Sequence, residues 1–369
     1  SSTWEAFHKQ YPDKPFLGNE ACSEVSTRGF YERTPFKSDR SGRTMYGDNK
    51  RGYVSSYSEN GPGWWASAED NWKAVVERPW MSGTFIWTGF DYKGEPLPFK
   101  QPKQPAVASS FGILDSCGFP KDSYYYYKSW WGDEPVVHVF PHWNWAGKES
   151  QKIPVWVHSN ADEVELFLNG TSLGRKKMER NSHLEWDVAY APGKLEAKGF
   201  FGGKEISDVV ETTGAPAKLV LDPDRTILAA DGKDLAWVAV KVTDAQGRVV
   251  PTAMNKIRFS VTGPGKIIGV GNGDSSSHEP DKASERSAFH GLCMVLVQTT
   301  QEWAGRIVLK AEAKGMTPAS VTLQSSENLE DTEWSDIRHW NANRVTLPRV
   351  LLVGDSVAGD YKRQVMMQL

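Results

Sequence analysis

The sequence predicts a multidomain chain that begins with an α/β region and continues with two small β-sandwiches. The length of 369 residues indicates two to four domains at roughly 100 to 200 residues each. Helical and strand patterns mix up to about residue 131, and hydrophobicity then alternates with a period of two. The net charge is −3 and no apolar run approaches the roughly 20 residues of a membrane-spanning helix, so neither nucleic acid nor a membrane is expected as a partner.

The first region, residues 1–132, shows the order strand, connection, helix and strand. Residues 14–20 form a short apolar segment that ends in polar groups. A helix is predicted over residues 67–77, because a serine cap and early acidic residues precede apolar side chains on one face, and Pro79 stops it. Residues 82–89 are rich in strand formers and bounded by glycine. This order is typical of a parallel β/α unit.

Two β-sandwiches are predicted over residues 135–213 and 216–324. Both ranges contain short segments with alternating apolar and polar side chains, separated by turn residues. Asn169 and Gly170 lie between two apolar runs and are a strong hairpin signal. Residues 325–346 are polar, acidic at first, and are interpreted as a linker.

Glu20 is the carboxylate of most interest in the first region. It follows an apolar segment, and catalytic groups in β/α barrels lie at the carboxyl ends of the strands, where the connecting loops gather. The residues alone leave two roles open for Glu20, catalysis or an ordinary surface or ion-paired position. The three cysteines and eight histidines show no metal-ligand spacing, so no metal site is expected.

Three long motifs in the first region carry a family resemblance. They are KPFLGNEACSEVSTRG at 14–29, GTFIWTGFDYKGEPLP at 83–98 and SSFGILDSCGFPKDSYYYYKSWW at 109–131. Together they resemble glycoside hydrolase family 2, in the branch that contains bacterial β-galactosidases. The resemblance implies that residues 1–132 are the C-terminal part of a (β/α)8 TIM barrel. It also implies that the two predicted sandwiches are immunoglobulin-like accessory domains.

The resemblance assigns roles to individual residues. Glu20 matches the nucleophile, and Trp87 matches the aromatic residue that forms the floor of the sugar subsite. Asp91 is either a ligand of substrate hydroxyls or a structural residue. Arg28 is expected to pair with a carboxylate rather than to bind sugar. Glu24 is not the second catalytic acid, because the family places that residue on an earlier strand.

The implied function is retaining glycoside hydrolysis, with a β-galactosidase as the first choice and terminal β-D-galactosides or related oligosaccharides as substrates. A retaining enzyme needs two carboxyl groups about 5 to 5.5 Å apart, one as nucleophile and one as acid/base. The resemblance places the acid/base and most barrel strands before Ser1. The chain is therefore expected to be a fragment whose partner is the missing N-terminal part of the same enzyme.

Other properties follow from the same resemblance. No cofactor is implied for this mechanism. Glucuronide and mannoside specificities stay open, because the residues that read the sugar hydroxyls would lie mostly in the missing strands. Relatives are often exported, so a periplasmic or extracellular location is expected, although the first residues show no signal peptide.

A second resemblance lies at the end of the chain. The apolar run at 349–353 leads into Gly354, Asp355 and Ser356, which resemble the first block of the SGNH or GDSL hydrolases. Ser356 is the implied acyl-transfer nucleophile, and residues 347–369 are interpreted as the truncated start of such a domain. Two alternative functions stay open: a carbohydrate- or partner-binding sandwich module, and part of a glycosidase–esterase fusion.

Overall fold

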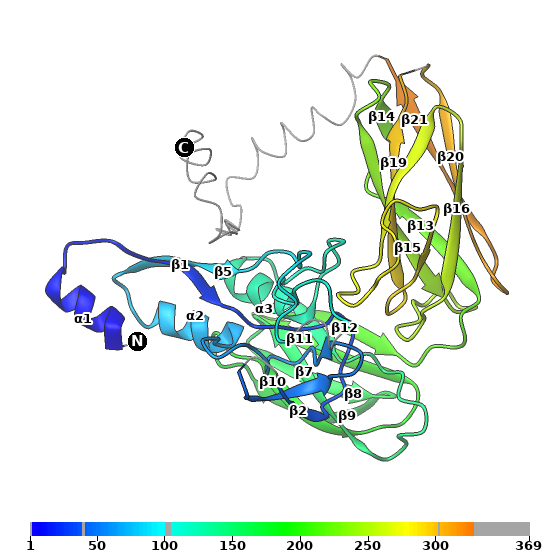
Figure 1. The fold of residues 1–369 in the computed structure, drawn as a ribbon. Coiled ribbons are helices and arrows are strands. Elements are labelled where there is room, and N and C mark those ends of the chain that lie inside the picture. The colour runs from blue at the N-terminus through cyan, green and yellow to red at the C-terminus, as the bar shows by residue number, and fades with distance from the viewer. Residues whose placement is uncertain (1, 39–40, 100–104, 302, 328–369) are drawn as a thin grey trace.

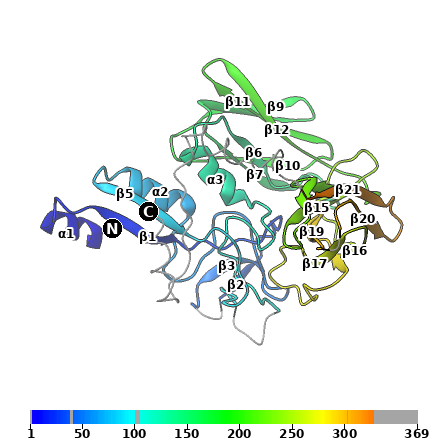
Figure 2. The same ribbon diagram turned by 90° about the horizontal axis from the view of Figure 1, so that it is seen from above.

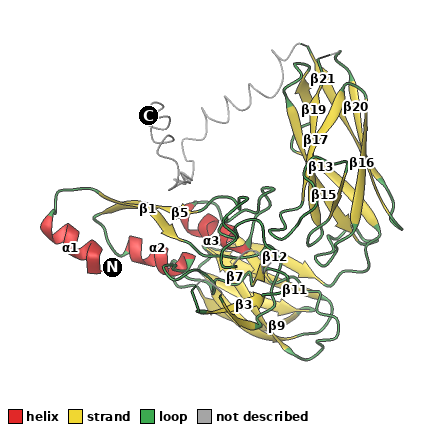
Figure 3. Ribbon diagram, in the orientation of Figure 1, coloured by secondary structure: helices red, strands yellow, loops and turns green. Residues whose placement is uncertain are grey.

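The computed structural model describes residues 2–38, 41–99, 105–301 and 303–327. Within them the chain forms an N-terminal unit up to residue 132 and two β-sandwiches that follow it (Figure 1). Most elements are strands, and the helices lie in the N-terminal unit (Figure 3). None of the helices in these described ranges is long and apolar enough to cross a membrane.

The N-terminal unit is built around two parallel strands and the helices that cover them. Its elements are α1 (Ser2–Gln10), β1 (Phe16–Cys22), β2 (Pro35–Lys37), β3 (Thr44–Asp48), β4 (Tyr53–Val54), α2 (Ala68–Val76), β5 (Met81–Trp87) and α3 (Asp122–Trp131). The predicted order of strand, helix and strand is confirmed by β1, α2 and β5. Ser67 caps α2 as predicted, because its side chain accepts a hydrogen bond of 3.0 Å from the Asp70 amide.

The predicted barrel segment is not evident as a barrel. In the described residues β1 pairs only with β5, in a two-stranded parallel sheet, and β2, β3 and β4 form a separate antiparallel sheet that the sequence patterns did not reveal. Two parallel strands cannot close a sheet, because closure requires a full ring of tilted strands. What the structure supports is a predominantly β chain with few helices.

The first sandwich follows α3. Its strands are β6 (Val137–Phe140), β7 (Lys152–Ser159), β8 (Glu163–Leu168), β9 (Thr171–Lys177), β10 (Leu184–Ala189), β11 (Lys194–Phe201) and β12 (Lys204–Glu211). They form sheets of order β10-β7-β6 and β12-β11-β8-β9, and alternate residues of both sheets fill the core around Trp143. Asn169 and Gly170 have φ values of 51° and 81° between β8 and β9, which confirms the predicted hairpin turn.

The second sandwich has a larger continuous core, which contains Phe259 and Val295. Its strands are β13 (Lys218–Pro223), β14 (Ile227–Ala229), β15 (Leu235–Thr243), β16 (Lys256–Thr262), β17 (Gly265–Gly271), β18 (Glu285–Ser287), β19 (Leu292–Thr299), β20 (Arg306–Ala313) and β21 (Ala319–Ser326). The sheet orders are β13-β15-β19-β17 and β14-β21-β20-β16-β18. β21 runs two residues past the predicted boundary at 324. The predicted domain at 347–369, with Ser356, lies outside the described residues.

Both sandwiches touch the N-terminal unit, and Figure 2 shows the first sandwich above this unit and the second to its right. The Tyr57 hydroxyl donates a hydrogen bond of 2.5 Å to the Pro154 carbonyl of the first sandwich. The Trp237 indole of the second sandwich donates one of 3.1 Å to the Cys117 carbonyl. Each sandwich therefore has a defined position against the unit that carries Glu20.

Candidate active site

Glu20 and Trp87 lie near the carboxyl ends of the two paired strands. Trp87 is the last residue of β5, and it pairs in register with Cys22, the last residue of β1. The Glu20 side chain is exposed and has no hydrogen-bond or ion-pair partner within the described part of the chain. The structure thus places an accessible carboxylate and an aromatic residue near the carboxyl ends of β1 and β5.

The chain turns sharply where β1 ends. Cys22 and Ser23 have positive φ values of 76° and 56°, a region that costs residues other than glycine roughly 1–2 kcal/mol each. The Cys22 thiol is buried, and burial raises its pKa to about 12, so the thiol stays protonated. The Ala66 amide donates a 2.8 Å hydrogen bond to the Cys22 carbonyl and holds the turn. Strain of this kind is concentrated at functional sites.

Trp87 is held by the segment that follows it. Its side chain packs on a core cluster that includes Val25, Leu97 and Phe99. The Tyr92 ring meets the Trp87 ring edge to face, with 5.9 Å between centroids and an interplanar angle of 87°. The peptide bond after Trp87 is cis. The position of the Trp87 ring therefore depends on residues up to about Phe99.

Asp91 forms a buried ion pair with Lys121. The Lys121 ammonium lies 2.8 Å from the Asp91 carboxylate and also donates to the carbonyls of Ser26 at 2.6 Å and Ser110 at 3.2 Å. The Gly112 amide donates to the same carboxylate at 2.8 Å. Burial raises the pKa of Asp91 to about 7, against the opposing effect of Lys121. These contacts favour the structural role of Asp91 over sugar binding.

Glu24 and Arg28 both make structural contacts. The Glu24 carboxylate accepts hydrogen bonds from the Ser58 hydroxyl and, at 2.9 Å, from the Ala68 amide at the start of α2. Burial raises the pKa of Glu24. Arg28 donates to the buried carboxylate of Asp115 at 2.6 Å, which confirms its predicted pairing with a carboxylate. These contacts give no support for either residue as the second catalytic group beside Glu20.

A cavity of about 210 Å³ lies between the N-terminal unit and the first sandwich. Its lining is rich in hydroxyl, carboxyl and imidazole groups: Glu24, Ser56, Ser58, Ser67, Ala68, Glu69, Asp70, Ser123, Tyr126, Trp156, His158 and His183. Burial lowers the pKa of His158 well below its ordinary value. Glu20 is not part of this lining. The sequence contained no signal for the cavity, because its residues come from separate segments of two units.

In the described ranges, no group of three or more His, Cys, Asp or Glu side chains is arranged to hold a metal ion. The predicted nucleophile Ser356 cannot be compared with Glu20, because it lies outside those ranges. The predicted site residues that lie near the carboxyl ends of the paired strands are Glu20 and Trp87.

Family models match both sandwiches. Residues 219–322 match glycoside hydrolase family 2 C-terminal domain 5, which corresponds to the second sandwich. Residues 150–207, in the first sandwich, match a domain of unknown function, DUF4982. The second sandwich therefore carries a domain type defined within one glycosidase family.

Several curated proteins are similar to most of the chain. The β-galactosidase BoGH2A of Bacteroides ovatus is 41% identical over 327 residues, which cover 86% of this chain and 37% of that protein. A putative β-glucuronidase of Formosa agariphila is 33% identical, covering 82% of this chain and 32% of that protein. The chain thus spans about a third of the length of these relatives.

Solved structures show the same similarity in three dimensions. A β-glycosidase from Bacteroides vulgatus has a TM-score of 0.78 and 31% identity, covering 87% of this chain and 43% of that one. A glycosyl hydrolase family 2 member from Bacteroides cellulosilyticus has a TM-score of 0.72 and 28% identity, covering 88% and 41%. The fold is therefore one that glycosidases of this family contain.

Proposed function

The family model and the relatives support glycoside hydrolase family 2 as the family of this chain, and from that premise we propose that it is part of a retaining β-glycosidase. Glu20 is the proposed nucleophile and Trp87 the proposed floor of the sugar subsite. The observation that carries the proposal is the accessible Glu20 carboxylate near the end of β1, beside the end of β5, where barrel enzymes hold their catalytic groups.

The proposed chemistry has two displacement steps. The Glu20 carboxylate attacks the anomeric carbon of a β-glycoside as the bond to the leaving oxygen breaks, and a second carboxyl group protonates that oxygen. Water, deprotonated by the same second group, then displaces Glu20 and releases the sugar with its original configuration. The second carboxyl group would come from a part of the enzyme that precedes this chain, as would the remaining barrel strands.

The proposed substrate is a terminal β-D-galactoside. The 41% identical relative is named a β-galactosidase, whereas the 33% identical relative is named a putative β-glucuronidase. The two sugars differ in the group at C6, a neutral hydroxymethyl in one and a carboxylate in the other. Parallel assays with chromogenic β-D-galactoside and β-D-glucuronide separate the two specificities, and turnover of the glucuronide alone would contradict the galactoside assignment.

The nucleophile is tested by Glu20→Ala in the complete enzyme that contains this chain. We expect turnover of the chromogenic glycoside to fall by at least about 10⁴-fold, as in other enzymes that lose a nucleophile. Added azide should then restore release of the chromophore, because the anion fits the space of the lost carboxylate and forms a bond to the anomeric carbon.

The rescued product identifies the role of Glu20. Attack by azide from the Glu20 side gives an α-glycosyl azide from a β-glycoside, which proton NMR distinguishes from the β-anomer. Glu185→Ala, which removes an exposed glutamate of the first sandwich, is the matched control and should keep normal turnover. Normal turnover by Glu20→Ala would show that the nucleophile lies elsewhere.

A further inference from the structure

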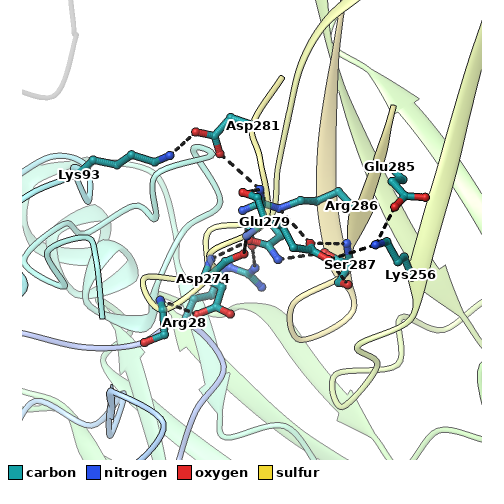
Figure 4. Close-up of polar contacts among 12 residues, drawn as sticks. Arg28, Lys93, Lys256, Asp274, Glu279, Asp281, Glu285, Arg286 and Ser287 are labelled. Carbon is teal, nitrogen blue, oxygen red and sulfur yellow. Dashed lines mark hydrogen bonds and ion pairs between the residues drawn. The ribbon is translucent and has the colours of Figure 1, made fainter. Parts of the chain in front are cut away.

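The connection between β17 and β18, residues 272–284, reaches from the second sandwich to the N-terminal unit, and we call it the docking loop. Figure 4 shows side chains on and beside this loop, among them Asp274 and Asp281, extending toward Arg28 and Lys93. Asp281 forms an ion pair with Lys93. The Tyr53 hydroxyl donates a hydrogen bond of 3.1 Å to Asp274.

Hydrogen bonds within the second sandwich fix the shape of the docking loop. The Asn272 side chain accepts from the guanidinium of Arg286 at 3.0 Å and from the Asp274 amide at 3.1 Å. It also donates to the Ser287 carbonyl at 3.0 Å. The side chain of Arg286 is 5% exposed. The loop is therefore an ordered extension of the second sandwich rather than an independent segment.

The loop binds the backbone of the segment that follows Trp87. The Ser275 carbonyl accepts hydrogen bonds from the Val107 amide at 2.8 Å and from the Ala108 amide at 3.1 Å. The His278 imidazole donates to the Pro105 carbonyl at 2.8 Å. Together with the Asp281–Lys93 ion pair, these contacts hold residues 92–99 and 105–109, which we call the paired arms.

The paired arms in turn hold Trp87. The Ser109 amide donates to the Tyr92 carbonyl at 2.8 Å, and the Gly94 amide donates to the Val107 carbonyl at 3.0 Å. The two arms are therefore hydrogen-bonded to each other, and the Tyr92 ring at their base contacts the ring of Trp87. A continuous set of contacts thus runs from Ser275 to the proposed sugar floor.

A second contact ties the loop to the segment that leaves β1 after Glu20. Arg28 donates to the Asn272 carbonyl at 2.9 Å and to the Phe289 carbonyl at 3.0 Å while it pairs with Asp115. Gly273 lies so close to Asp115 that a Cβ atom there would be 1.7 Å from a carboxylate oxygen. The docking loop therefore contacts both segments that carry the candidate site residues.

We propose that the docking loop is a positioning element of the candidate active site: it fixes the paired arms, residues 92–99 and 105–109, and through them Trp87, and so sets the affinity for the sugar. This inference rests on the proposed function, because it assigns Trp87 to the sugar subsite. No residue of the loop is placed in contact with the reacting atoms. Its effect is expected on substrate binding rather than on bond cleavage.

Gly273→Ala is the variant that tests the loop. The added methyl group must push the loop away from Asp115. Gly247→Ala is the matched control, because Gly247 lies in the same sandwich with a φ of +86°, similar to the +74° of Gly273, and has no atom within 4 Å of an added Cβ. Both variants carry the same backbone strain, so the difference between them reports the lost contact.

The first measurement is hydrogen exchange at Val107 and Ala108 in the 369-residue chain, which needs no substrate. Both amides donate to Ser275. We expect them to exchange at least about 10-fold faster in Gly273→Ala than in the wild type, with Gly247→Ala unchanged. Equal exchange in all three proteins would overturn the proposal.

The second measurement is steady-state hydrolysis of the chromogenic β-galactoside by the complete enzyme. We expect KM to rise about 5- to 10-fold in Gly273→Ala, with kcat within about 2-fold of the wild type. A fall in kcat at unchanged KM would indicate only a loss of folded enzyme and would contradict positioning. If the wild type hydrolyses no glycoside, the proposed function fails and positioning fails with it, whereas hydrolysis with an unaltered KM in Gly273→Ala overturns positioning alone.

His278→Ala provides a milder variant in case Gly273→Ala does not fold. It removes one exposed side chain and its hydrogen bond to Pro105. We expect a KM increase of about 2-fold, in the same direction. Lys310→Ala is its control, because Lys310 is an exposed residue of β20 that pairs with Glu312 of the same strand at 2.7 Å. A KM increase in the control equal to that in His278→Ala would contradict the proposal.

Discussion

The buried Asp91–Lys121 pair shows how a side chain that resembles a substrate ligand can instead support the site. Asp91 lies four residues after Trp87. The Lys121 ammonium donates to two backbone carbonyls as well as to the Asp91 carboxylate. Lys121 has a fully buried side chain, and that of Asp91 is 4% exposed. A buried charge is tolerated only with its partner, so both residues are needed to keep the segment after Trp87 in place.

We predict that Lys121→Met lowers the free energy of unfolding by about 3–5 kcal/mol, because it leaves the Asp91 carboxylate buried without its cation. The double variant with Asp91→Asn should lose less, since no charge is then stranded. Urea titration followed by tryptophan fluorescence measures both. A loss in the double variant that equals or exceeds the loss in Lys121→Met would argue against this account of the pair.

At the scale of elements, α2 is joined to the first sandwich through His183. The His183 imidazole lies 2.6 Å from Glu69 of α2 and 2.8 Å from Glu185 of β10. The His183 ring stacks on the Trp156 ring with 4.1 Å between their centroids, and its centroid lies 6.0 Å from that of the His158 ring. Burial lowers the pKa of His183, but the two carboxylates more than offset this, and the net pKa is raised.

The raised pKa predicts a pH-dependent link between α2 and the sandwich. The stabilising effect of protonated His183 is fully present below the unfolded pKa of about 6.5 and is lost as pH rises through the higher folded pKa. His183→Gln should therefore destabilise the protein more at pH 6 than at pH 8.5. Thermal unfolding of both proteins at the two pH values measures this. His278→Gln, remote from α2, is the control, and a pH-independent difference for His183→Gln would contradict the prediction.

On the scale of the whole molecule, the described parts of the three units differ in the size of their apolar cores. The second sandwich contains one continuous core cluster that extends from Leu219 to Leu323. The N-terminal unit has only smaller clusters, and apolar side chains such as Leu17 and Phe90 are 49% and 51% exposed. A domain with its own core can fold alone, whereas exposed strand edges and small clusters favour association with more chain.

We therefore predict that residues 216–327 fold as an isolated domain, with a cooperative and reversible thermal transition in circular dichroism. Residues 1–132 alone should show no such transition. The comparison tests where the cooperative core lies, because both pieces are measured under the same conditions. A cooperative transition in residues 1–132 would show that β1, β5 and the helices suffice for folding.

The elements that were predicted correctly have local signals. The cap at Ser67, the Asn169–Gly170 turn and the alternating strands are encoded by a few neighbouring residues. Several short elements, such as β2 and β4, were missed because three or two residues carry too little periodicity. Glu20 and Trp87 were proposed as site residues from motifs, and the parallel pairing of β1 with β5 explains why both lie near the same end of the sheet.

The sequence by itself determined the β-rich character of the chain, the order of its units and the strand-end positions of Glu20 and Trp87, since these depend on local periodicity and motifs. Only the tertiary structure decided the contacts of Asp91 and Arg28. Arg28 meets Asp115 and Asn272, which are 87 and 244 residues further along the chain. Such pairings depend on how whole units pack, and neither spacing nor composition encodes which distant side chains fill the same buried space.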